Sequence, residues 1–568
     1  MRRSVFLCFV LLAFHAQAQT PYVGIPYFDQ ALQRAQLLGQ LDSSISFTVR
    51  PVDAVRAAGI QDIYRGDSLL FPADTNRYAS WAKQKHKKDD EVYWALLPLV
   101  AKYRLNIHHP YSRNDGPMIT AKGSQIYHSL GVYGRAKWFE MQLVPELVWA
   151  ENQILHNPPA RVFNIDNPDR FGEDPYQRIF LGQSFLKLHL GPVAVGVSNE
   201  NVWWGPGQTN AILMSNNAPG FLHLSIHSNK PIATPIGSFE FQLIGGRARY
   251  SGFSGYATQP DSITDTLNTS TIVPNTQLGE KPHSWISAGV MSYQPKWIPG
   301  LFLGVTRAVQ DIDRPNLPWF YFGAFNPLMQ EEFEADGSFF RNQLISVFAK
   351  YAIPKVGFEV YVEVGREDRW WDFEDLMTDP MHSTVWLAGM RRIRKLPGKS
   401  HWLETNFEVT RLQAPVATLI RSTGYSFYSH FNGVGWTNRG QVMGAGIAPG
   451  SNLHHFSVNW NREYFLLGLG FERLSHSEDL FVTSIPYIRR DRDNLLTVDY
   501  TKRWIDWSVM MNFQLAWRGI FLGGRTQLVR TYNYKWLPNP NSGPASAFRL
   551  PGYNLWSQNY EGYIIYRF

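Results

Sequence analysis

Along most of the chain after Glu91, apolar and polar side chains alternate with a period of two. Residues 358–364 read Phe-Glu-Val-Tyr-Val-Glu-Val, which gives one apolar face and one mostly polar face, and residues 186–190, 239–243 and 511–518 repeat this pattern. A period of two is that of a β-strand. Many weak segments of this kind, without long apolar helices between them, are typical of the strands of a transmembrane barrel.

Short and long connections alternate between these segments. In transmembrane barrels the periplasmic turns are short and the extracellular loops are longer. The same alternation, begun from a periplasmic N-terminal region, returns the C-terminus to the periplasm. Tight turns are expected near Lys137, Gly191-Pro192, Pro354-Lys355, Pro397-Gly398, Asn461-Arg462 and Arg518-Gly519, and long connections over residues 151–178, 250–284, 310–340, 413–452 and 531–559.

The number of strand-like segments is about twenty by our count, which lies within the even-numbered range of bacterial barrels. The last segment, 560–568, places Tyr560, Ile564 and Tyr566 on the same face as the terminal Phe568. An aromatic C-terminus on an alternating strand resembles the signal that outer-membrane insertion machinery reads. We therefore predict an all-β fold, a transmembrane antiparallel β-barrel of residues 91–568 in the outer membrane of a Gram-negative-type bacterium.

Before the barrel, residues 19–90 favour helices. Apolar residues recur with helical spacing from Tyr27 to Leu38, and Gly39 supplies a stop. Residues 51–58 and 72–88 favour two further short helices, the second ending in a lysine run that is typical of a solvated helix end. We predict a periplasmic helical plug region for residues 19–90.

The N-terminus has the three parts of a secretory signal peptide. Arg2 and Arg3 precede an apolar run over residues 5–14, and a small-residue cleavage pattern ends at Ala18. The run is too short for a membrane-spanning helix, which needs about 20 residues. We assign residues 1–18 to the signal peptide. Cys8, the only cysteine, lies inside the apolar run, so the mature chain has no disulfide, thiolate metal site or cysteine nucleophile.

Composition agrees with a barrel better than with several soluble domains. Aromatic residues make up 15% of the 568 residues, whereas the mean hydropathy is only −0.26. A barrel suits both values because one residue in two faces lipid, rings collect at both interfaces and the lumen stays polar. Removal of Arg2 and Arg3 leaves 52 basic against 47 acidic residues. This small excess identifies no partner, although it is compatible with an acidic polymer.

The most unusual segment, residues 199–220, contains Trp-Trp-Gly-Pro-Gly and then Ser-Asn-Asn-Ala. Glycine tolerates positive φ and proline fixes its own φ, so Gly-Pro-Gly favours a tight reversal. Two indoles beside several amides suit a sugar site on an extracellular connection. They also suit an interfacial aromatic girdle followed by a structural hairpin. The candidate polysaccharide-binding residues are Trp203, Trp204, Asn201, Asn216 and Asn217, with Gly205, Pro206 and Gly207 as the structural turn.

On this segment the sequence resembles the capsule assembly Wzi family, whose members carry Trp-Trp-Gly-Pro-Gly followed by Ser-Asn-Asn-Ala. Looser similarity covers residues 27–52, residues 299–310 with Arg307, and residues 438–444 with Arg439. The resemblance implies an eighteen-stranded barrel, a periplasmic helical plug and a lectin-like role that holds capsular polysaccharide at the cell surface. Arg307 and Arg439 join the candidate site as contacts for acidic sugars, as Arg247 and Arg249 could, although arginines in barrels also pair with lumen carboxylates.

Catalytic and metal sites are not favoured by the sequence. Residues 370–375 combine rings with acids, as a glycosidase would need, but an acidic extracellular loop explains them as well. The adjacent pairs His108-His109 and His454-His455 would diverge on a strand, and no zinc-binding or serine-elbow spacing occurs. We expect no metal, no cofactor and no enzymatic activity.

Our leading hypothesis is therefore a barrel that binds or anchors an exported capsular or surface polysaccharide. The expected partners are that polysaccharide, outer-membrane lipid and the barrel insertion machinery, with no nucleic acid. An outer-membrane diffusion channel or transporter is the main alternative, because it would share the barrel and the polar lumen. A surface hydrolase is the third.

Overall fold

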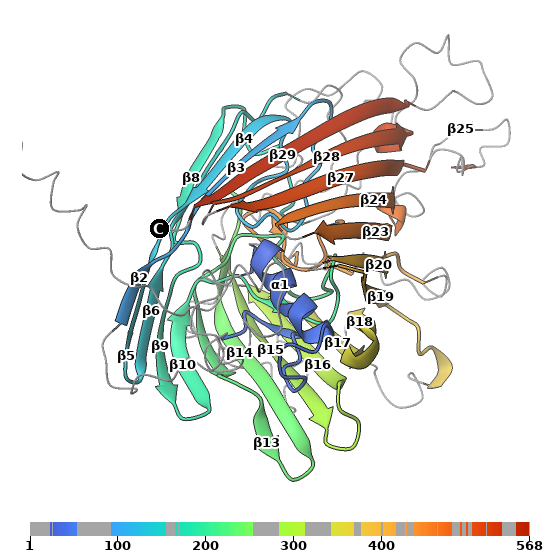
Figure 1. The fold of residues 1–568 in the computed structure, drawn as a ribbon. Coiled ribbons are helices and arrows are strands. Elements are labelled where there is room, and N and C mark those ends of the chain that lie inside the picture. Colours follow the sequence, from blue (N-terminus) through green and yellow to red (C-terminus); the bar gives the residue numbers. More distant parts are fainter. Residues whose placement is uncertain are drawn as a thin grey trace, which may run out of the picture.

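The chain forms a closed antiparallel β-barrel with a short helix inside it (Figure 1). The computed structural model describes residues 23–24, 26–53, 93–154, 165–168, 170–253, 283–312, 342–367, 377–398, 401–415, 427–428, 435–462, 464–479, 489–490, 496–497, 503–517, 520–536 and 553–566. The predicted signal peptide, the helix predicted at 72–88 and the acidic stretch 370–375 lie outside these residues. The boundaries of the N-terminal regions stay predictions.

The wall strands follow the chain as antiparallel neighbours, and β29 closes the barrel by pairing with β3. Their bounds are β2 (Tyr93–Leu96), β3 (Leu99–Asn106), β4 (Gly123–Ser129), β5 (Val132–Ala136), β6 (Phe139–Leu143), β7 (Glu146–Ala150), β8 (Tyr176–Phe180), β9 (Phe185–Leu190), β10 (Val193–Ser198), β12 (His223–Ser228), β13 (Ile232–Thr234), β14 (Gly237–Arg249), β15 (His283–Pro295), β16 (Leu301–Ile312), β17 (Asn342–Ile353), β18 (Phe358–Glu367), β19 (Thr384–Lys395), β20 (His401–Arg411), β23 (Asn452–Arg462), β24 (Phe465–Ser475), β27 (Ile505–Trp517), β28 (Ile520–Tyr532) and β29 (Leu555–Tyr566).

In the described residues these 23 wall strands make eighteen crossings of the wall. Five consecutive pairs, namely β2/β3, β4/β5, β6/β7, β8/β9 and β12/β13, each continue one another across a short break. Pro98 and Pro145 lie in two of the breaks, where proline offers no N–H to the ladder. Such breaks split one crossing into two segments, so our count of about twenty was too high and the eighteen implied by the family resemblance is confirmed.

The wall has its apolar face outside and its polar face inside, as the alternation predicted. On β18, Val360 and Val362 are 43% and 42% exposed, whereas Glu359 and Glu363 are 1% and 0% exposed. The outer faces of β9, β27 and β29 are likewise apolar or aromatic. Because a soluble β-protein would bury its apolar face, this inside-out arrangement is that of a barrel in lipid.

Helix α1 (Pro26–Leu37) lies within the ring of strands (Figure 1). It ends as predicted at Gly39, which has a φ of 74°, and the N–H of Gln40 donates to the carbonyl of Ala35 in a Schellman arrangement. Among its described side chains, Ala31, Leu32, Ala35, Leu37 and Arg34 are buried, because the inner wall surrounds the helix. The Arg34 guanidinium forms an ion pair 3.4 Å from the carboxylate of Glu404 on β20. No described helix has the length and apolar character required to cross a bilayer.

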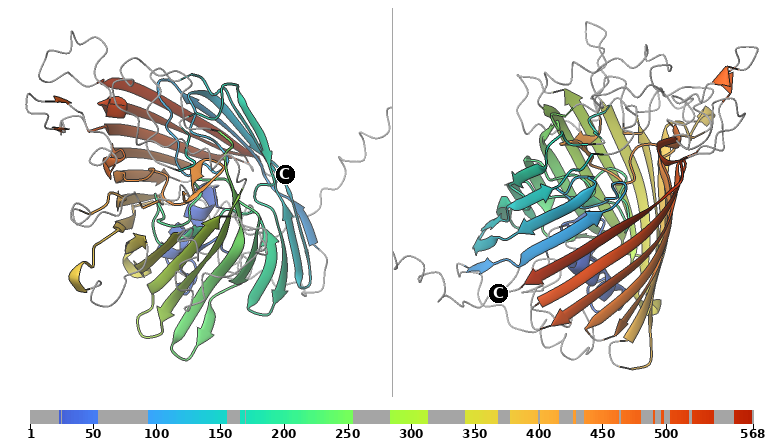
Figure 2. Two further views of the ribbon diagram at one scale, coloured as in Figure 1. Left: turned by 180° about the vertical axis from the view of Figure 1, so that it is seen from behind. Right: turned by 90° about the horizontal axis from the view of Figure 1, so that it is seen from above.

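The barrel has two unlike ends. At the turn end the wall strands are joined by short connections, and the C-terminal end of β29 lies there (Figure 2, right). At the opposite loop end the connections are long, as in residues 151–175, 199–222 and 412–451. Most of the predicted tight turns and long connections match these positions, although the short turns 235–236 and 296–300 were missed. Residues 51–53, the described part of the helix predicted at 51–58, are not helical.

Candidate functional site

The segment singled out in the sequence, residues 199–222, connects β10 to β12 and folds down into the barrel. Its short strand β11 (Trp203–Trp204) pairs with β1 (Val49–Arg50) of the N-terminal region. Trp203 and Trp204 are only 5% and 0% exposed. The segment is a loop-end connection, as the alternation of connections predicted, but its indoles are buried inside the barrel and form neither an exposed sugar-binding surface nor an interfacial girdle. The reason is that β1 offers strand pairing inside the lumen, which no sequence pattern revealed.

Both indoles already have partners in the lumen. Trp204 donates its Nε1–H to Oε1 of Gln242 on β14, at 2.9 Å. The Arg50 guanidinium lies over the Trp203 ring, 4.6 Å from its centroid, in a cation–π contact. A pyranose needs an open ring face for stacking. With these contacts in place, neither indole offers one.

The Gly-Pro-Gly turn fits against the wall at close range. Gly205 has a φ of 111°, and a Cβ built on it would lie 2.5 Å from Oε2 of Glu363. A Cβ on Gly207 would lie 2.0 Å from the carbonyl oxygen of Asn210. Glycine is thus required at position 205 because of the positive φ and because a Cβ would not fit, and at position 207 because a Cβ would not fit. Pro206 is buried between them.

The residues after this turn wrap around a wall carboxylate. The backbone N–H groups of Gln208, Thr209 and Asn210 donate to Glu408 on β20 at 2.7, 3.1 and 2.9 Å. The Tyr361 hydroxyl donates to the same carboxylate at 2.8 Å. A buried carboxylate is stabilised by several donors of this kind. The turn is therefore fixed to the wall by charge-assisted hydrogen bonds.

The candidate amides are also engaged in structural hydrogen bonds. Asn201 donates its Nδ2–H to Oδ1 of Asn216, at 2.6 Å. Asn216 in turn donates to the carbonyl of Asn114, at 2.9 Å. Asn217 donates to the carbonyl of Val442, at 2.9 Å. These bonds join three distant connections, and Asn217 also borders a cavity.

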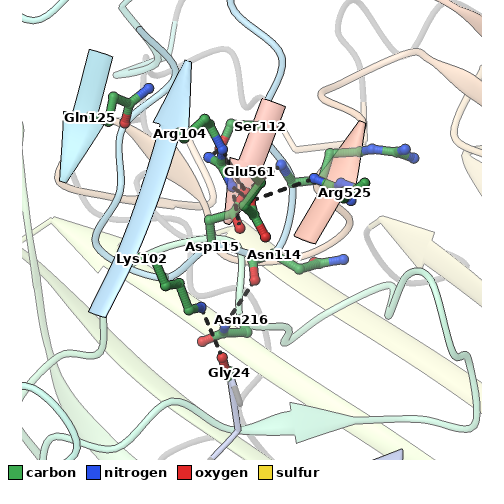
Figure 3. Close-up of polar contacts among 12 residues, drawn as sticks. Gly24, Lys102, Arg104, Ser112, Asn114, Asp115, Gln125, Asn216, Arg525 and Glu561 are labelled. Atoms are coloured by element: carbon green, nitrogen blue, oxygen red, sulfur yellow. Dashed lines mark hydrogen bonds and ion pairs between the residues drawn. The ribbon is translucent and has the colours of Figure 1, made fainter. Parts of the chain in front are cut away.

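Asn216 lies next to the seam at which the first and last strands close the barrel (Figure 3). Arg104 on β3 pairs with Glu561 on β29 and, at 2.6 Å, with Asp115 in the β3–β4 connection. Lys102, also on β3, donates to the carbonyl of Gly24 in the N-terminal region, at 3.2 Å. The N-terminal segment, the closing strands and the sequence motif are thus bonded together at one place.

The two candidate arginines lie in different surroundings. Arg307 on β16 alternates with the buried Thr306 and Ala308, so it belongs to the outer face, where it donates to Oε1 of Gln343 at 2.7 Å. Arg439 lies at the loop end between β21 (Thr437–Asn438) and β22 (Gln441–Val442). The structure therefore does not bring Arg307 to the other candidate residues.

A cavity of about 210 Å³ opens at the loop end of the barrel. We call it the loop-end cavity. Segments from six connections converge on it, so it exists only in the folded barrel. Its lining is His109, Pro110, Tyr111, Ser112, Arg113, Thr120, Ile165, Asn167, Pro168, Asn217, Gln441, Val442, Gly446, Ile447, Ala448, Pro449, Leu474, His476, Ser477, Trp504, Tyr534 and Lys535.

Aromatic rings form one side of the loop-end cavity. The His476 imidazole stacks on the Trp504 indole at 3.8 Å between ring centroids, with 13° between their planes. Tyr534 meets the Trp504 ring edge-on at 5.3 Å. Behind them, Asp506 on β27 accepts from His476 at 2.8 Å and from the Thr531 hydroxyl at 2.6 Å. The rings are thus held rigidly, as a stacking platform requires.

The polar lining of the loop-end cavity is basic or neutral. Its charged or titratable nitrogen groups are His109, Arg113, His476 and Lys535, and the lining residues that the structure describes include no aspartate or glutamate. Arg113 pairs with the buried Glu472. Amides of Asn167, Asn217 and Gln441 complete the lining. In the described part of the chain, no group of three or more histidine, cysteine or acidic side chains is arranged to hold a metal ion.

The comparisons with known proteins support the family resemblance. The family profile of the capsule assembly protein Wzi matches residues 112–460. No curated protein sequence matches the chain. Among solved structures, the outer-membrane protein Wzi of Escherichia coli, a carbohydrate-binding β-barrel involved in group 1 capsule assembly, is 12% identical with a TM-score of 0.58, and the match covers 97% of this chain and 99% of that one.

Two other solved barrels are more distant. OccK11 of Pseudomonas aeruginosa is 8% identical over 85% of this chain and 99% of its own, and OccAB2 of Acinetobacter baumannii is 9% identical over 83% and 97%; both have a TM-score of 0.38. The likeness to the Escherichia coli protein shows the fold. Because the family profile matches more than half of the 568 residues, this chain belongs to the capsule assembly protein Wzi family of outer-membrane β-barrels.

Proposed function

We propose that this barrel binds an exported capsular polysaccharide in the loop-end cavity and holds it at the cell surface without catalysing a reaction. Family membership and the carbohydrate binding of the Escherichia coli protein support the ligand class. In this proposal the loop end faces the outside of the cell, the turn end and α1 face the periplasm, and the outer wall contacts lipid after assembly by the barrel insertion machinery.

The observation that carries the proposal is the chemistry of the cavity lining. Sugars are bound by aromatic faces that pack on C–H groups and by amides and hydroxyls that bond the ring hydroxyls. The loop-end cavity combines Trp504, Tyr534 and Tyr111 with Asn167, Asn217 and Gln441. A volume of about 210 Å³ is suited to one or two sugar units of a longer chain.

The candidate residues divide into two roles in this proposal. Asn217, which borders the cavity, contacts the polysaccharide. Trp203, Trp204, Asn201 and Asn216 support the cavity from below through their hydrogen bonds and packing.

The test is the binding of capsular polysaccharide, prepared from encapsulated cells, to the full-length detergent-purified protein. Trp504→Ala should weaken binding by about tenfold or more, because it removes the stacking face. Trp517→Ala is the matched control: it removes an indole that is 61% exposed on the outer wall at the turn end, and should leave affinity unchanged. Equal affinities of the two variants, each with intact heat-modifiable folding, would refute the proposed site.

Two further readouts separate the alternatives. Current through planar bilayers should be small, because α1 and residues 199–222 occupy the lumen; a large steady conductance would favour a channel.

Incubation with the polysaccharide should produce no new reducing ends; their appearance would show a hydrolase. In cells, deletion of the gene should release polysaccharide into the medium without stopping its synthesis.

A further inference from the structure

Three arginines at the loop end form a group that the sugar-binding role of the cavity does not use. Arg178 lies on β8, Arg249 ends β14, and Arg439 lies between β21 and β22. Over the described residues, none of the three has a carboxylate within ion-pair distance, unlike Arg104, Arg113 and Arg391, which all have one. We call these three residues the arginine cluster.

Backbone hydrogen bonds bring the three residues to one place. The N–H of Arg439 donates to the carbonyl of Arg249 at 2.6 Å, and the N–H of Arg249 donates to Oδ1 of Asn438 at 2.9 Å. The Arg178 guanidinium donates to the carbonyl of Ser251, two residues beyond Arg249, at 3.5 Å. Burial and then the positive charges of Arg178 and Arg249 lower the pKa of Arg439. The three charges are therefore close enough to repel one another.

Aromatic faces hold two of the guanidinium groups. The Arg178 guanidinium lies over Tyr176 at 5.4 Å and over Phe253 at 5.9 Å, and that of Arg439 lies over Phe180 at 5.5 Å. Stacking on a ring fixes the plane of a guanidinium and leaves its N–H edge for a ligand. Asp166 is also in this region, but both its oxygens accept from Ser251, through the backbone N–H and the hydroxyl.

Arg178 faces the interior of the loop end, and Arg249 is exposed at the end of β14, after the buried Ala248. On β8, Ile179 is 73% exposed on the outer wall, whereas Tyr176 and Phe180 are buried on the inner face that Arg178 shares. The loop-end cavity is adjacent. A Cβ on Gly440 would lie 2.8 Å from Pro168, and Pro168 and Gln441 both line the cavity.

Uncompensated like charges in a partly buried place are unfavourable, and a bound oxyanion would relieve them. A guanidinium binds a carboxylate through two parallel hydrogen bonds. We propose that Arg178, Arg249 and Arg439 bind the carboxylate of an acidic sugar unit in the polysaccharide whose neighbouring unit occupies the loop-end cavity. This inference rests on the proposed function and adds its ligand class, a uronic-acid type of polysaccharide.

The test compares the capsular polysaccharide with the same preparation after chemical reduction of its carboxyl groups, both titrated against the full-length protein in detergent. The wild type should bind the native polymer at least about tenfold more tightly than the reduced one, and this preference should shrink as salt screens the charges. Arg439→Gln should abolish most of the preference and leave affinity for the reduced polymer unchanged. Arg249→Gln, at an exposed position, provides a second variant should Arg439→Gln fail to fold.

Arg307→Gln is the matched control, because it removes the same charge from the outer wall and should keep the preference. Equal binding of native and reduced polymer by the wild type overturns this inference but leaves the proposed function standing. If neither polymer binds, the proposed function fails with it. If both polymers bind with equal affinity and inorganic phosphate competes with them, the arginine cluster binds a phosphate group, such as that of a lipid headgroup, and not a carboxylate.

Discussion

The motif segment in the lumen and the loop-end cavity both contain tryptophan beside amides, but they differ in every other respect. The indoles of Trp203 and Trp204 are enclosed and their polar neighbours are bonded to the wall. Trp504 has one face on His476 and borders a cavity with Tyr534. The former region is filled by protein, and the latter has space for a ligand.

This difference teaches that a recognisable sequence pattern can mark a structural junction. The Trp-Trp-Gly-Pro-Gly stretch and the three residues after it join β1, β14, β18 and β20 inside the lumen, where close packing requires glycine at positions 205 and 207. The loop-end cavity needs only aromatic rings and amides, and these can come from several separate loops. The segment with the clearest pattern is therefore the support, and the surface that we propose binds the ligand has no pattern of its own.

The largest expected effect is that of Trp204→Ala. Removal of a fully buried indole from a packed interior should lower the free energy of unfolding by about 3–5 kcal/mol. Urea unfolding in detergent, followed by the loss of heat-modifiable migration, measures this change. A stability close to that of the wild type would mean that the lumen is not packed around Trp204, and the contrast between a filled lumen and an open loop-end cavity would fail.

Gly205→Ala should have the next largest effect. The φ of 111° is unfavourable for alanine, and its Cβ would approach Glu363 to 2.5 Å. Together these should cost about 1–3 kcal/mol of unfolding free energy. Gly252→Ala, at a φ of 80° with no atom near the new Cβ, is a control for the conformational part alone. Equal losses for the two variants would show that the close approach to the wall contributes nothing.

Glu408→Gln should have the smallest effect of the three. The N–H groups of residues 208–210 donate to both carboxylate oxygens, so an amide, which has only one oxygen, leaves one of them without its acceptor and loses the charge, and a loss of about 1 to 1.5 kcal/mol is expected. The same unfolding assay applies. Polysaccharide affinity of the folded variant should be unchanged, and a tenfold weaker affinity would indicate that the motif segment contacts the ligand after all.

Most of the fold could be predicted from the sequence because lipid imposes a strict alternation on the wall. Segments such as 358–364 show the period of two plainly, and the connections alternate in length. The strand count was less accessible, since breaks such as that at Pro98 divide one crossing into two short segments. Helix α1 was visible in its own spacing and stop at Gly39.

The candidate site was less predictable. Asn217, which we propose contacts the ligand, lies in a distinctive stretch, whereas Trp504, Tyr534 and His476 come from separate loops with no local pattern. Only the closed barrel brings these loops together. Likewise, nothing in the sequence distinguishes the indole pair of a buried strand from one on a loop, because the difference depends on the pairing of Trp203 with Arg50.

The central claim, that the ligand occupies the loop end and not the lumen, is tested most directly by hydrogen exchange of the full-length protein with and without capsular polysaccharide. The account predicts that ligand slows exchange in residues 107–113, 441–449 and 533–536 and leaves residues 199–214 unchanged. Slower exchange confined to residues 199–214 would contradict it.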